Sequence, residues 1–194
     1  MADHDLTEHT TAREELLKGH FLHVVRDTVR LPDGRSAPRE YVLHPGAVAV
    51  VPLLDDGSIV LERQYRHPTR QVMIEIPAGK LDAGEGALAC GQRELLEETG
   101  YVAREWAYAF KLYPTVAYSD EAIEVWFARG LEHRGAQLDH GEFLEVFTAT
   151  QQEFLQWCSD GRIVDSKTLA AAVWIQNVAA GTWKLDWQAL PFNP

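Results

Sequence analysis

The sequence predicts an α/β fold, in which a mixed sheet is sandwiched between helices and preceded by an N-terminal β-hairpin region. Short apolar, β-branched runs follow one another between turn signals. One helix-forming segment interrupts these runs, and two more close the chain. The length of 194 residues suits one domain with a small appendage. We therefore expect a lead-in and hairpin over residues 1–44 and the main domain over residues 45–194.

The hairpin is predicted from residues 20–44, where two extended runs flank the turn-forming pair Asp33 and Gly34. Residues 1–20 are polar and contain no apolar core, so we do not expect a secretory signal there. We expect that segment to be a partly disordered or helical lead-in.

The main sheet is predicted from apolar runs separated by turns. The run over residues 46–54 is almost continuously apolar, which is typical of a strand buried on both faces. A turn over residues 55–57 separates it from the next run. The other expected strands lie at residues 58–66, 71–77, 105–114, 121–131 and 142–149.

Three segments carry helix signals. Residues 86–99 have helical composition and end at Gly100, a typical C-terminal glycine. A second helix is predicted to start at Thr150, because Glu153 stands three residues later in a capping-box pattern. Ser166 is the expected cap of the third helix.

Composition excludes several classes of protein. Hydrophobic residues make up 46% of the chain, and the formal net charge is -11. An acidic chain is not expected to bind nucleic acid, and no apolar run is long enough for a membrane span. The two cysteines, Cys90 and Cys158, lack the spacing of a metal site or disulfide framework, which favours a reducing, cytoplasmic compartment. Cys90 is expected to be a buried small residue. An anionic small molecule remains a candidate ligand if metal ions and arginines offset the repulsion.

Several carboxylates crowd the central helix, in the segment GKLDAGEGALACGQRELLEETGY. At about 100° per residue, Glu94 and Glu98 lie on one face and Glu97 flanks it. Arg93 stands four residues before Glu97 and can orient its carboxylate. Adjacent carboxylates repel each other, but a hard divalent cation reverses that repulsion because it prefers oxygen ligands. A solvated charged face is the commoner use of such a pattern.

The same segment resembles a known family signature. Its fixed positions are Gly79, Glu85, Arg93-Glu94-Leu95, Glu97-Glu98, Gly100 and the apolar Tyr101. They match the signature of the Nudix hydrolases at every fixed position. The resemblance implies the Nudix α/β/α sandwich. It also implies hydrolysis of a nucleoside diphosphate linked to another moiety, with Mg²⁺ or Mn²⁺ as cofactor.

Within this signature over residues 79–101, called the box from here on, the resemblance implies roles for individual residues. Glu94 and Glu98 are the expected metal ligands, with Glu97 sharing the metals and the backbone carbonyl of Ala78 as a further ligand. Arg93 orients the box carboxylates, and Glu85 ties the loop to the helix.

The flanking sequence resembles the ADP-ribose pyrophosphatases. In VLERQYRHPTRQVMIEIPAGKLDAGE, Arg63 and Arg66 stand where that subfamily places arginines before the box, suited to gripping a diphosphate. The alternative is an exposed basic strand end. Glu121 matches the position that binds the terminal ribose, or simply opens a strand. The subfamily's common Ser-Pro-Gly reads here as Pro114-Thr115-Val116, which leaves the sugar open.

The resemblance also points outside the box. The catalytic base is expected on a mobile loop, with Glu142 the first candidate and Glu145 and Asp139 behind it, against the alternative of plain surface carboxylates. The expected catalytic set is therefore Glu142, Glu97 and Arg93.

The N-terminal region resembles one that this subfamily exchanges across a two-fold homodimer. Phe21 is then expected to stack on the adenine and Arg39 to hydrogen-bond it, although an aromatic in a strand more often packs in a core.

The leading hypothesis is hydrolysis of ADP-ribose to AMP and ribose 5-phosphate. Another nucleotide sugar or a dinucleotide coenzyme is the alternative within the enzyme class. The alternative from another class is a Nudix-like sensor that binds its ligand without hydrolysis. Such sensors usually lack box carboxylates, whereas all of them stand here.

Overall fold

The computed structural model describes residues 6–136, 138, 141 and 143–190. The chain forms two compact units. The first contains residues 1–45 and 115–122, and the second contains residues 46–114 and 123–194.

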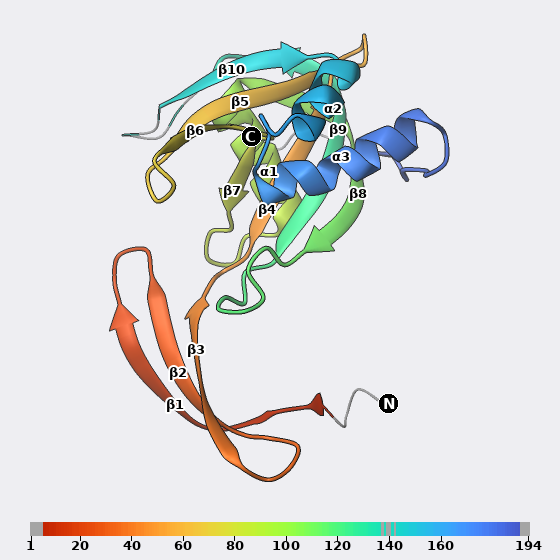
Figure 1. The fold of residues 1–194 in the computed structure, drawn as a ribbon. Helices are drawn as coiled ribbons and strands as arrows, with labels where there is room; N and C mark the ends of the chain where they lie inside the picture. The colour runs from red at the N-terminus through yellow and green to blue at the C-terminus, as the bar shows by residue number, and fades with distance from the viewer. Residues whose placement is uncertain (1–5, 137, 139–140, 142, 191–194) are drawn as a thin grey trace. The chain divides into compact units, whose positions relative to one another are not determined.

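The first unit is built on an antiparallel sheet of strands in the order β1-β2-β3 (Figure 1). Its strands are β1 (His9–Lys18), β2 (His23–Arg30) and β3 (Ser36–Leu43). The predicted hairpin corresponds to β2 and β3. The expectation of a disordered or helical lead-in was wrong, because His9–Lys18 is a strand paired with β2. Every residue of β1 is exposed, so no apolar periodicity marks it in the sequence.

One buried carboxylate ties these strands together. Asp27 on β2 accepts hydrogen bonds from Arg13 Nε at 2.7 Å, Tyr41 Oη at 3.0 Å and Thr10 Oγ1 at 3.1 Å. The hydrogen bond from Arg13 is the main cause that lowers the pKa of Asp27 to about 2. Strand β1 is therefore held by polar contacts rather than by an apolar face.

The segment 115–122 joins the first unit through β3. Val42 donates its N–H to the carbonyl of Tyr118 at 2.9 Å, and its own carbonyl accepts from Asp120 N at 3.3 Å. The Asp120 carboxylate in turn accepts from His44 N at 2.7 Å. The sequence places this segment in the main domain, residues 45–194, and its contact with β3 has no local signal.

The second unit contains a mixed sheet in the order β10-β5-β4-β9-β8-β11, with β6 paired to β5 and β7 paired to β4. Strand β4 runs parallel to β9, and the other pairs are antiparallel. Strands β7 and β11 are too short to give a sequence signal. The strands are β4 (Ala47–Leu53), β5 (Ile59–Arg66), β6 (Gln71–Glu75), β7 (Ala78–Lys80), β8 (Tyr101–Leu112), β9 (Ile123–His133), β10 (Leu144–Ala149) and β11 (Gln188–Ala189).

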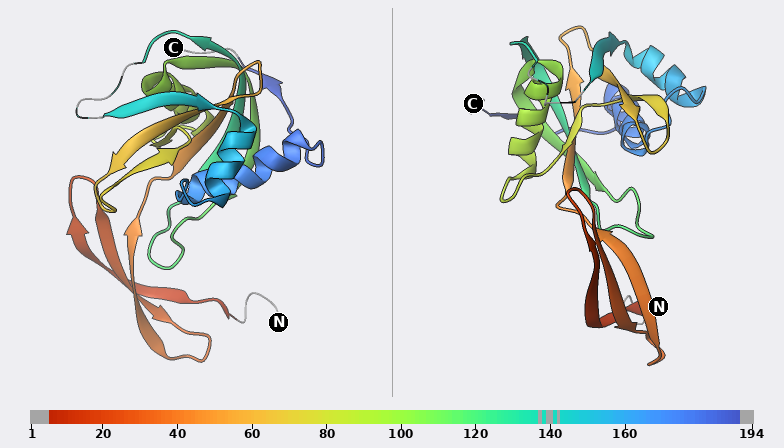
Figure 2. Two further views of the ribbon diagram at one scale, coloured as in Figure 1. Left: turned by 45° about the horizontal axis from the view of Figure 1, so that its top comes forward. Right: turned by 90° about the vertical axis from the view of Figure 1, so that its left-hand side faces the viewer.

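Helices cover both faces of this sheet. Helix α1 (Ala87–Thr99) lies on one face, and α2 (Gln151–Ser159) and α3 (Ser166–Ala179) lie on the other (Figure 2). The predicted mixed sheet between helices is therefore confirmed. The capping box of α2 is present, but the cap of α3 is Asp165 rather than Ser166. Asp165 accepts from Thr168 N at 3.0 Å, because its carboxylate reaches the first turn of the helix.

The hydrophobic core has a part on each face of the sheet. Strand β4 is buried between them, as its apolar run predicts. On the α1 side, Gly91 brings the helix close to β4, since a Cβ there would lie 3.3 Å from a Val48 methyl carbon. No helix in the described part of the chain has the length and apolar character needed to cross a membrane.

Candidate active site

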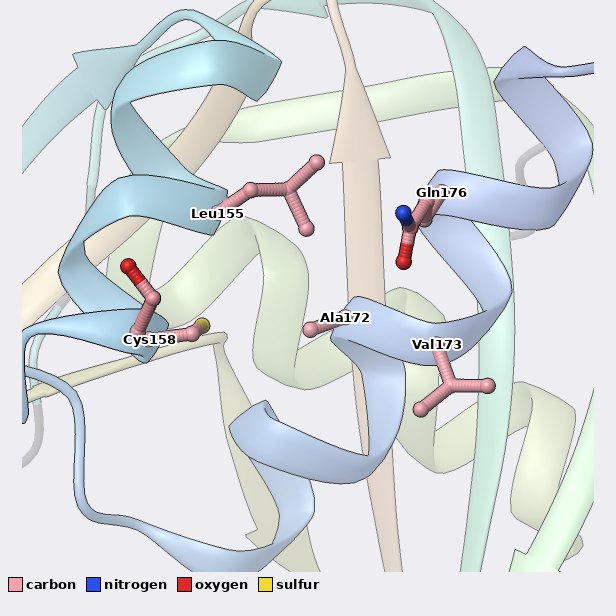
Figure 3. Close-up of a pocket in the computed structure, with 6 residues that line it drawn as sticks. Leu155, Cys158, Ala172, Val173 and Gln176 are labelled. Carbon is pink, nitrogen blue, oxygen red and sulfur yellow. The ribbon is translucent and has the colours of Figure 1, made fainter.

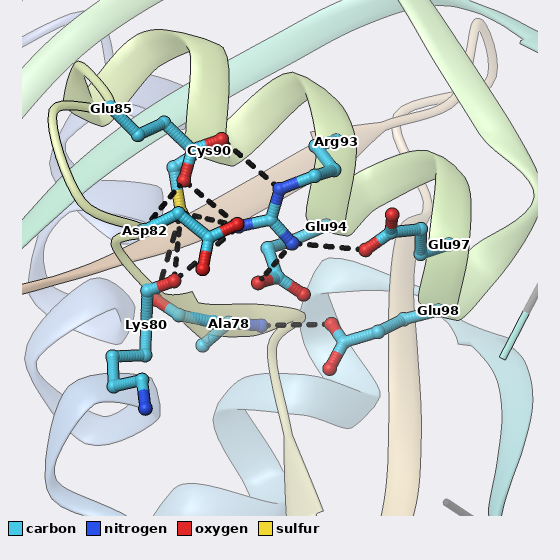
Figure 4. Close-up of polar contacts among 10 residues, drawn as sticks. Ala78, Lys80, Asp82, Glu85, Cys90, Arg93, Glu94, Glu97 and Glu98 are labelled. Carbon is cyan, nitrogen blue, oxygen red and sulfur yellow. Dashed lines mark hydrogen bonds and ion pairs between the residues drawn. The ribbon is translucent and has the colours of Figure 1, made fainter. Parts of the chain in front are cut away.

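Helix α1 presents its carboxylates because its other face is buried. Leu95 is fully buried and packs in the core cluster that also contains Val50 and Trp106. The helix ends at Gly100, whose φ of 75° suits glycine and whose N–H bonds the carbonyl of Leu96. The apolar stripe thus fixes the rotation of the helix, and the glutamates lie on the side near β7 (Figure 4).

Arg93 bridges three carboxylates. Its Nη1 lies 2.8 Å from Glu94 Oε1 and 2.9 Å from Glu97 Oε2. Its Nε and Nη2 donate to the two Glu85 oxygens at 3.0 and 2.9 Å, a bidentate pair. The bond from Arg93 is the main cause that lowers the pKa of Glu85 to about 2. One cation therefore orders carboxylates that would otherwise repel each other (Figure 4).

Two glutamates of α1, Glu98 and Glu94, also contact the β7 segment. Glu98 is buried, and its Oε2 accepts from Ala78 N at 3.0 Å. The Glu94 carboxylate lies directly against Gly79, since a Cβ built on Gly79 would fall 1.8 Å from Glu94 Oε1. Only glycine leaves that space open. The box glycine and the box glutamate, 15 positions apart in sequence, are thus a matched pair.

The donor set has the chemistry of a site for a hard divalent cation. Glu94, Glu97 and Glu98 offer carboxylate oxygens, and Gly79 keeps open the space in which the Glu94 carboxylate lies. Among the residues described, no three His, Cys, Asp or Glu side chains form a ready-made metal cluster. Arg93 and the Ala78 amide hold carboxylate oxygens at these positions. The residues therefore fit Mg²⁺ or Mn²⁺ by donor type.

Cys90 lies beside this cluster as a buried, free thiol. Its Sγ is 3.4 Å from Arg93 Nη2 and 3.5 Å from the carbonyl oxygen of Lys80. Burial, followed by the negative charges of Glu85 and Glu94, raises the pKa of the thiol to about 12. The thiol stays protonated at neutral pH, which agrees with its expected role as a buried small residue.

The two arginines expected to bind substrate lie on β5, each with a protein partner. Arg66 makes a bidentate pair with Glu75, with Nε–Oε1 at 2.8 Å and Nη2–Oε2 at 2.9 Å. Arg63 lies 3.1 Å from Glu145 and 4.0 Å above the centre of the Phe147 ring. Glu145, a reserve candidate for the catalytic base, is thus the cross-strand partner of Arg63.

Three expected substrate contacts belong to the first unit. Phe21 is exposed beside the β1–β2 turn. Arg39 on β3 pairs with Glu8. Glu121 lies 3.8 Å from His44 Nε2.

The first candidate for the catalytic base, Glu142, and the reserve candidate Asp139 are not placed. Glu142 and Asp139 lie outside the described residues. Gly141 between them has a φ of 92°, a turn conformation that favours glycine.

Sequence reasoning missed a buried ionic cluster around Glu75. Lys167, at the start of α3, pairs with both Glu75 and Asp165. Burial alone would raise the pKa of Glu75, but hydrogen bonds from Arg66 and the charge of Lys167 outweigh it and lower that pKa. Lys167 is 92 positions from Glu75, so no local pattern relates them.

A separate pocket lies between α2 and α3 (Figure 3). It lacks the charged side chains that a diphosphate requires, and burial raises the pKa of its cysteine, Cys158. Its lining residues are Leu155, Cys158, Ser159, Ala172, Val173 and Gln176.

Comparison with family models gives two adjoining matches. Residues 43–170 match the NUDIX domain. Residues 8–42 match the nucleoside diphosphate sugar hydrolase N-terminal domain. The resemblance carried by residues 79–101 is thereby confirmed.

Relatives of similar length support the same assignment. The chain is 40% identical to the methanol dehydrogenase activator of Bacillus methanolicus, over 87% of this chain and 92% of that protein. It is 36% identical to the ADP-ribose pyrophosphatase of Bacillus subtilis, over 88% of this chain and 94% of that protein. It is also 36% identical to the ADP-ribose pyrophosphatase of Mycobacterium tuberculosis, over 93% of this chain and 88% of that protein. The crystal structure of an ADP compounds hydrolase has the same fold, with a TM-score of 0.78 at 20% identity, covering 91% of this chain and 97% of that one.

Proposed function

Because the chain belongs to the Nudix hydrolase family, we propose that it hydrolyses the diphosphate bond of ADP-ribose to give AMP and ribose 5-phosphate. The observation that carries the proposal is the carboxylate cluster of α1, gathered by Arg93 beside Ala78 and Gly79. The choice of ADP-ribose is supported by the two relatives named ADP-ribose pyrophosphatase and by the match of residues 8–42.

The proposed cofactor is Mg²⁺ or Mn²⁺. Glu94, Glu98 and the carbonyl oxygen of Ala78 would hold it, and Glu97 would share it. When bound, such an ion neutralises phosphate charge and activates water for in-line attack. Arg93 acts on the protein side, because it keeps Glu94 and Glu97 in place against their mutual repulsion.

Arg66 and Arg63 are proposed to bind the diphosphate. Arginine forks suit phosphate oxygens, and the chain's charge of -11 makes such local cations necessary for an anionic ligand. Both arginine side chains keep over a third of their surface exposed, at 37% for Arg63 and 39% for Arg66. Each can therefore meet a ligand while paired with its glutamate.

The remaining contacts are proposed from the family resemblance. Glu121 would bind the terminal ribose, and Phe21 and Arg39 the adenine, in a homodimer with an exchanged N-terminal region. Glu142 would act as catalytic base. Light scattering would test the dimer, and a mass of one chain, 21.8 kDa, would contradict it.

The direct test is a substrate panel. The purified protein is incubated with Mg²⁺ and ADP-ribose, ADP-glucose, GDP-mannose, NADH or a dinucleoside polyphosphate, and kcat/KM and products are compared. The proposal expects ADP-ribose to lead and to yield AMP with ribose 5-phosphate. A different leading substrate would contradict ADP-ribose while leaving the hydrolase assignment in place. Binding of ADP-ribose without turnover would favour the sensor.

A further inference from the structure

Glu75 is the centre of a buried ionic cluster that stands beside the candidate site. It lies at the end of β6 and is 1% exposed. Arg66 holds both of its oxygens, and Lys167 contacts Oε2 from the first turn of α3. A buried carboxylate is stable as an ion only when it is paired and hydrogen-bonded. The two cations meet that requirement together.

Lys167 is held in turn by its own helix. Its side chain is 8% exposed, and Nζ lies 3.0 Å from Asp165 Oδ2. The same oxygen accepts from Thr168 N at 3.0 Å and from Thr168 Oγ1 at 2.6 Å. The contacts therefore form a chain from the cap of α3 through Lys167 and Glu75 to Arg66.

A second contact fixes α3 against the backbone directly after Glu75. Ile76 N donates to Thr168 Oγ1 at 3.1 Å. The next two residues are held from other elements, because the Pro77 carbonyl accepts from Val50 N at 2.9 Å and Ala78 N donates to Glu98. Glu75 therefore has little freedom to shift, and its carboxylate is a fixed hydrogen-bond partner for the Arg66 guanidinium group.

We propose that Lys167 is a positioning residue, which acts through Glu75 to orient Arg66 toward the diphosphate of the substrate. This inference rests on the proposed role of Arg66 in substrate binding. Without Lys167, the buried Glu75 carboxylate keeps one cation, and it turns or takes up a proton. The bidentate fork then loosens, and the Arg66 guanidinium samples several orientations. The loss falls on substrate binding rather than on the carboxylates of α1.

The test compares Lys167→Met with Lys111→Met. Methionine keeps an unbranched chain as far as Cε and removes the ammonium group and its charge. Lys111 is a matched control, since it pairs with Glu124 at 3.2 Å on the exposed surface of β8. Lys167→Met is expected to raise KM for ADP-ribose about tenfold and to change kcat less than about threefold. Lys111→Met is expected to leave both unchanged. An unchanged KM, or a fall in kcat alone, would overturn the proposal.

A double variant protects the test against misfolding. Glu75→Gln with Lys167→Met leaves no unpaired charge between these two side chains. If Lys167 acts through Glu75, adding Lys167→Met to Glu75→Gln changes KM by less than about twofold. A further tenfold rise in that background would show another route and refute the assignment.

A measurement independent of turnover separates this proposal from the proposed function. The Arg66 Nε–H signal in nitrogen-15 NMR is assigned by its loss in Arg66→Lys. Its exchange with solvent is expected to be about tenfold faster in Lys167→Met than in the wild type, because the bond to Glu75 loosens. Equal exchange rates would overturn the positioning role. A wild type that hydrolyses no compound of the panel would refute the proposed function, and the exchange rates would still decide the role of Lys167.

Discussion

Arg93 and Gly79 carry the geometry of the candidate site at the scale of single residues. Arg93 lies against Glu85, Glu94 and Glu97, so one guanidinium offsets much of the repulsion within the box. Gly79 serves the same cluster by lacking a side chain, because the Glu94 carboxylate lies where a Cβ would stand. The site thus depends on the positive charge of Arg93 and on the absence of a side chain at Gly79.

Gly79→Ala is expected to displace the Glu94 carboxylate and to lower kcat/KM for ADP-ribose by about tenfold or more. The reason is the approach of 1.8 Å between the built Cβ and Glu94 Oε1. Steady-state kinetics would measure the loss, with circular dichroism to verify folding.

The matched control is Gly86→Ala in the same box segment. Gly86 has a φ of -82°, and a Cβ there meets no atom of the described residues within 4 Å. This variant is expected to keep wild-type kinetics, with the free energy of unfolding lowered by up to about 1 kcal/mol, because Gly86 is the N-cap of α1 and alanine is the poorer cap. Equal losses in both variants would contradict the proposed Gly79–Glu94 contact.

At the scale of single elements, local sequence chemistry predicts helix ends well. Thr150 and Glu153 form the capping box that their spacing indicates. The cap of α3 was misassigned by one residue, since Asp165 and Ser166 are both good caps and sequence does not decide between them. Strand β1 was missed because its stability comes from Asp27 and its partners, 14 to 17 positions away.

Thr150→Ala is expected to lower the free energy of unfolding by about 1 kcal/mol, because it removes the cap of α2. Helix α2 carries none of the box residues, so kcat/KM should stay at the wild-type value. Urea unfolding would measure the change in stability. A loss of activity without a loss of stability would contradict a purely structural role for this cap.

The link between β6 and α3 is expected to make stability depend on pH. The folded pKa of Glu75 is below its ordinary value of 4.5. Its contribution to stability is therefore present above pH 4.5 and is lost as the pH falls through the lower, folded pKa. Urea unfolding of the wild type and Glu75→Gln between pH 7 and pH 3 would measure it. The stability difference should shrink toward low pH, and a difference that grows would contradict the assignment.

At the scale of the whole molecule, the sequence predicts the sheet between helices and the box face of α1. Both predictions rest on patterns within short stretches of sequence, namely the apolar runs of the strands and the four-residue spacing of Glu94 and Glu98. It does not predict that residues 115–122 join the first unit, or that Lys167 reaches Glu75. Those contacts join distant positions, and nothing in the sequence near either partner signals them.

The central claim is that the α1 carboxylates are the catalytic centre of a metal-dependent hydrolase. It is tested most directly by comparing the wild type with Glu98→Gln on ADP-ribose and Mg²⁺. Glutamine keeps an acceptor for Ala78 N, so circular dichroism should be unchanged. Turnover should fall about 100-fold or more, since a metal supplies several kcal/mol of transition-state stabilisation. Near-wild-type turnover by a folded Glu98→Gln protein would contradict the claim.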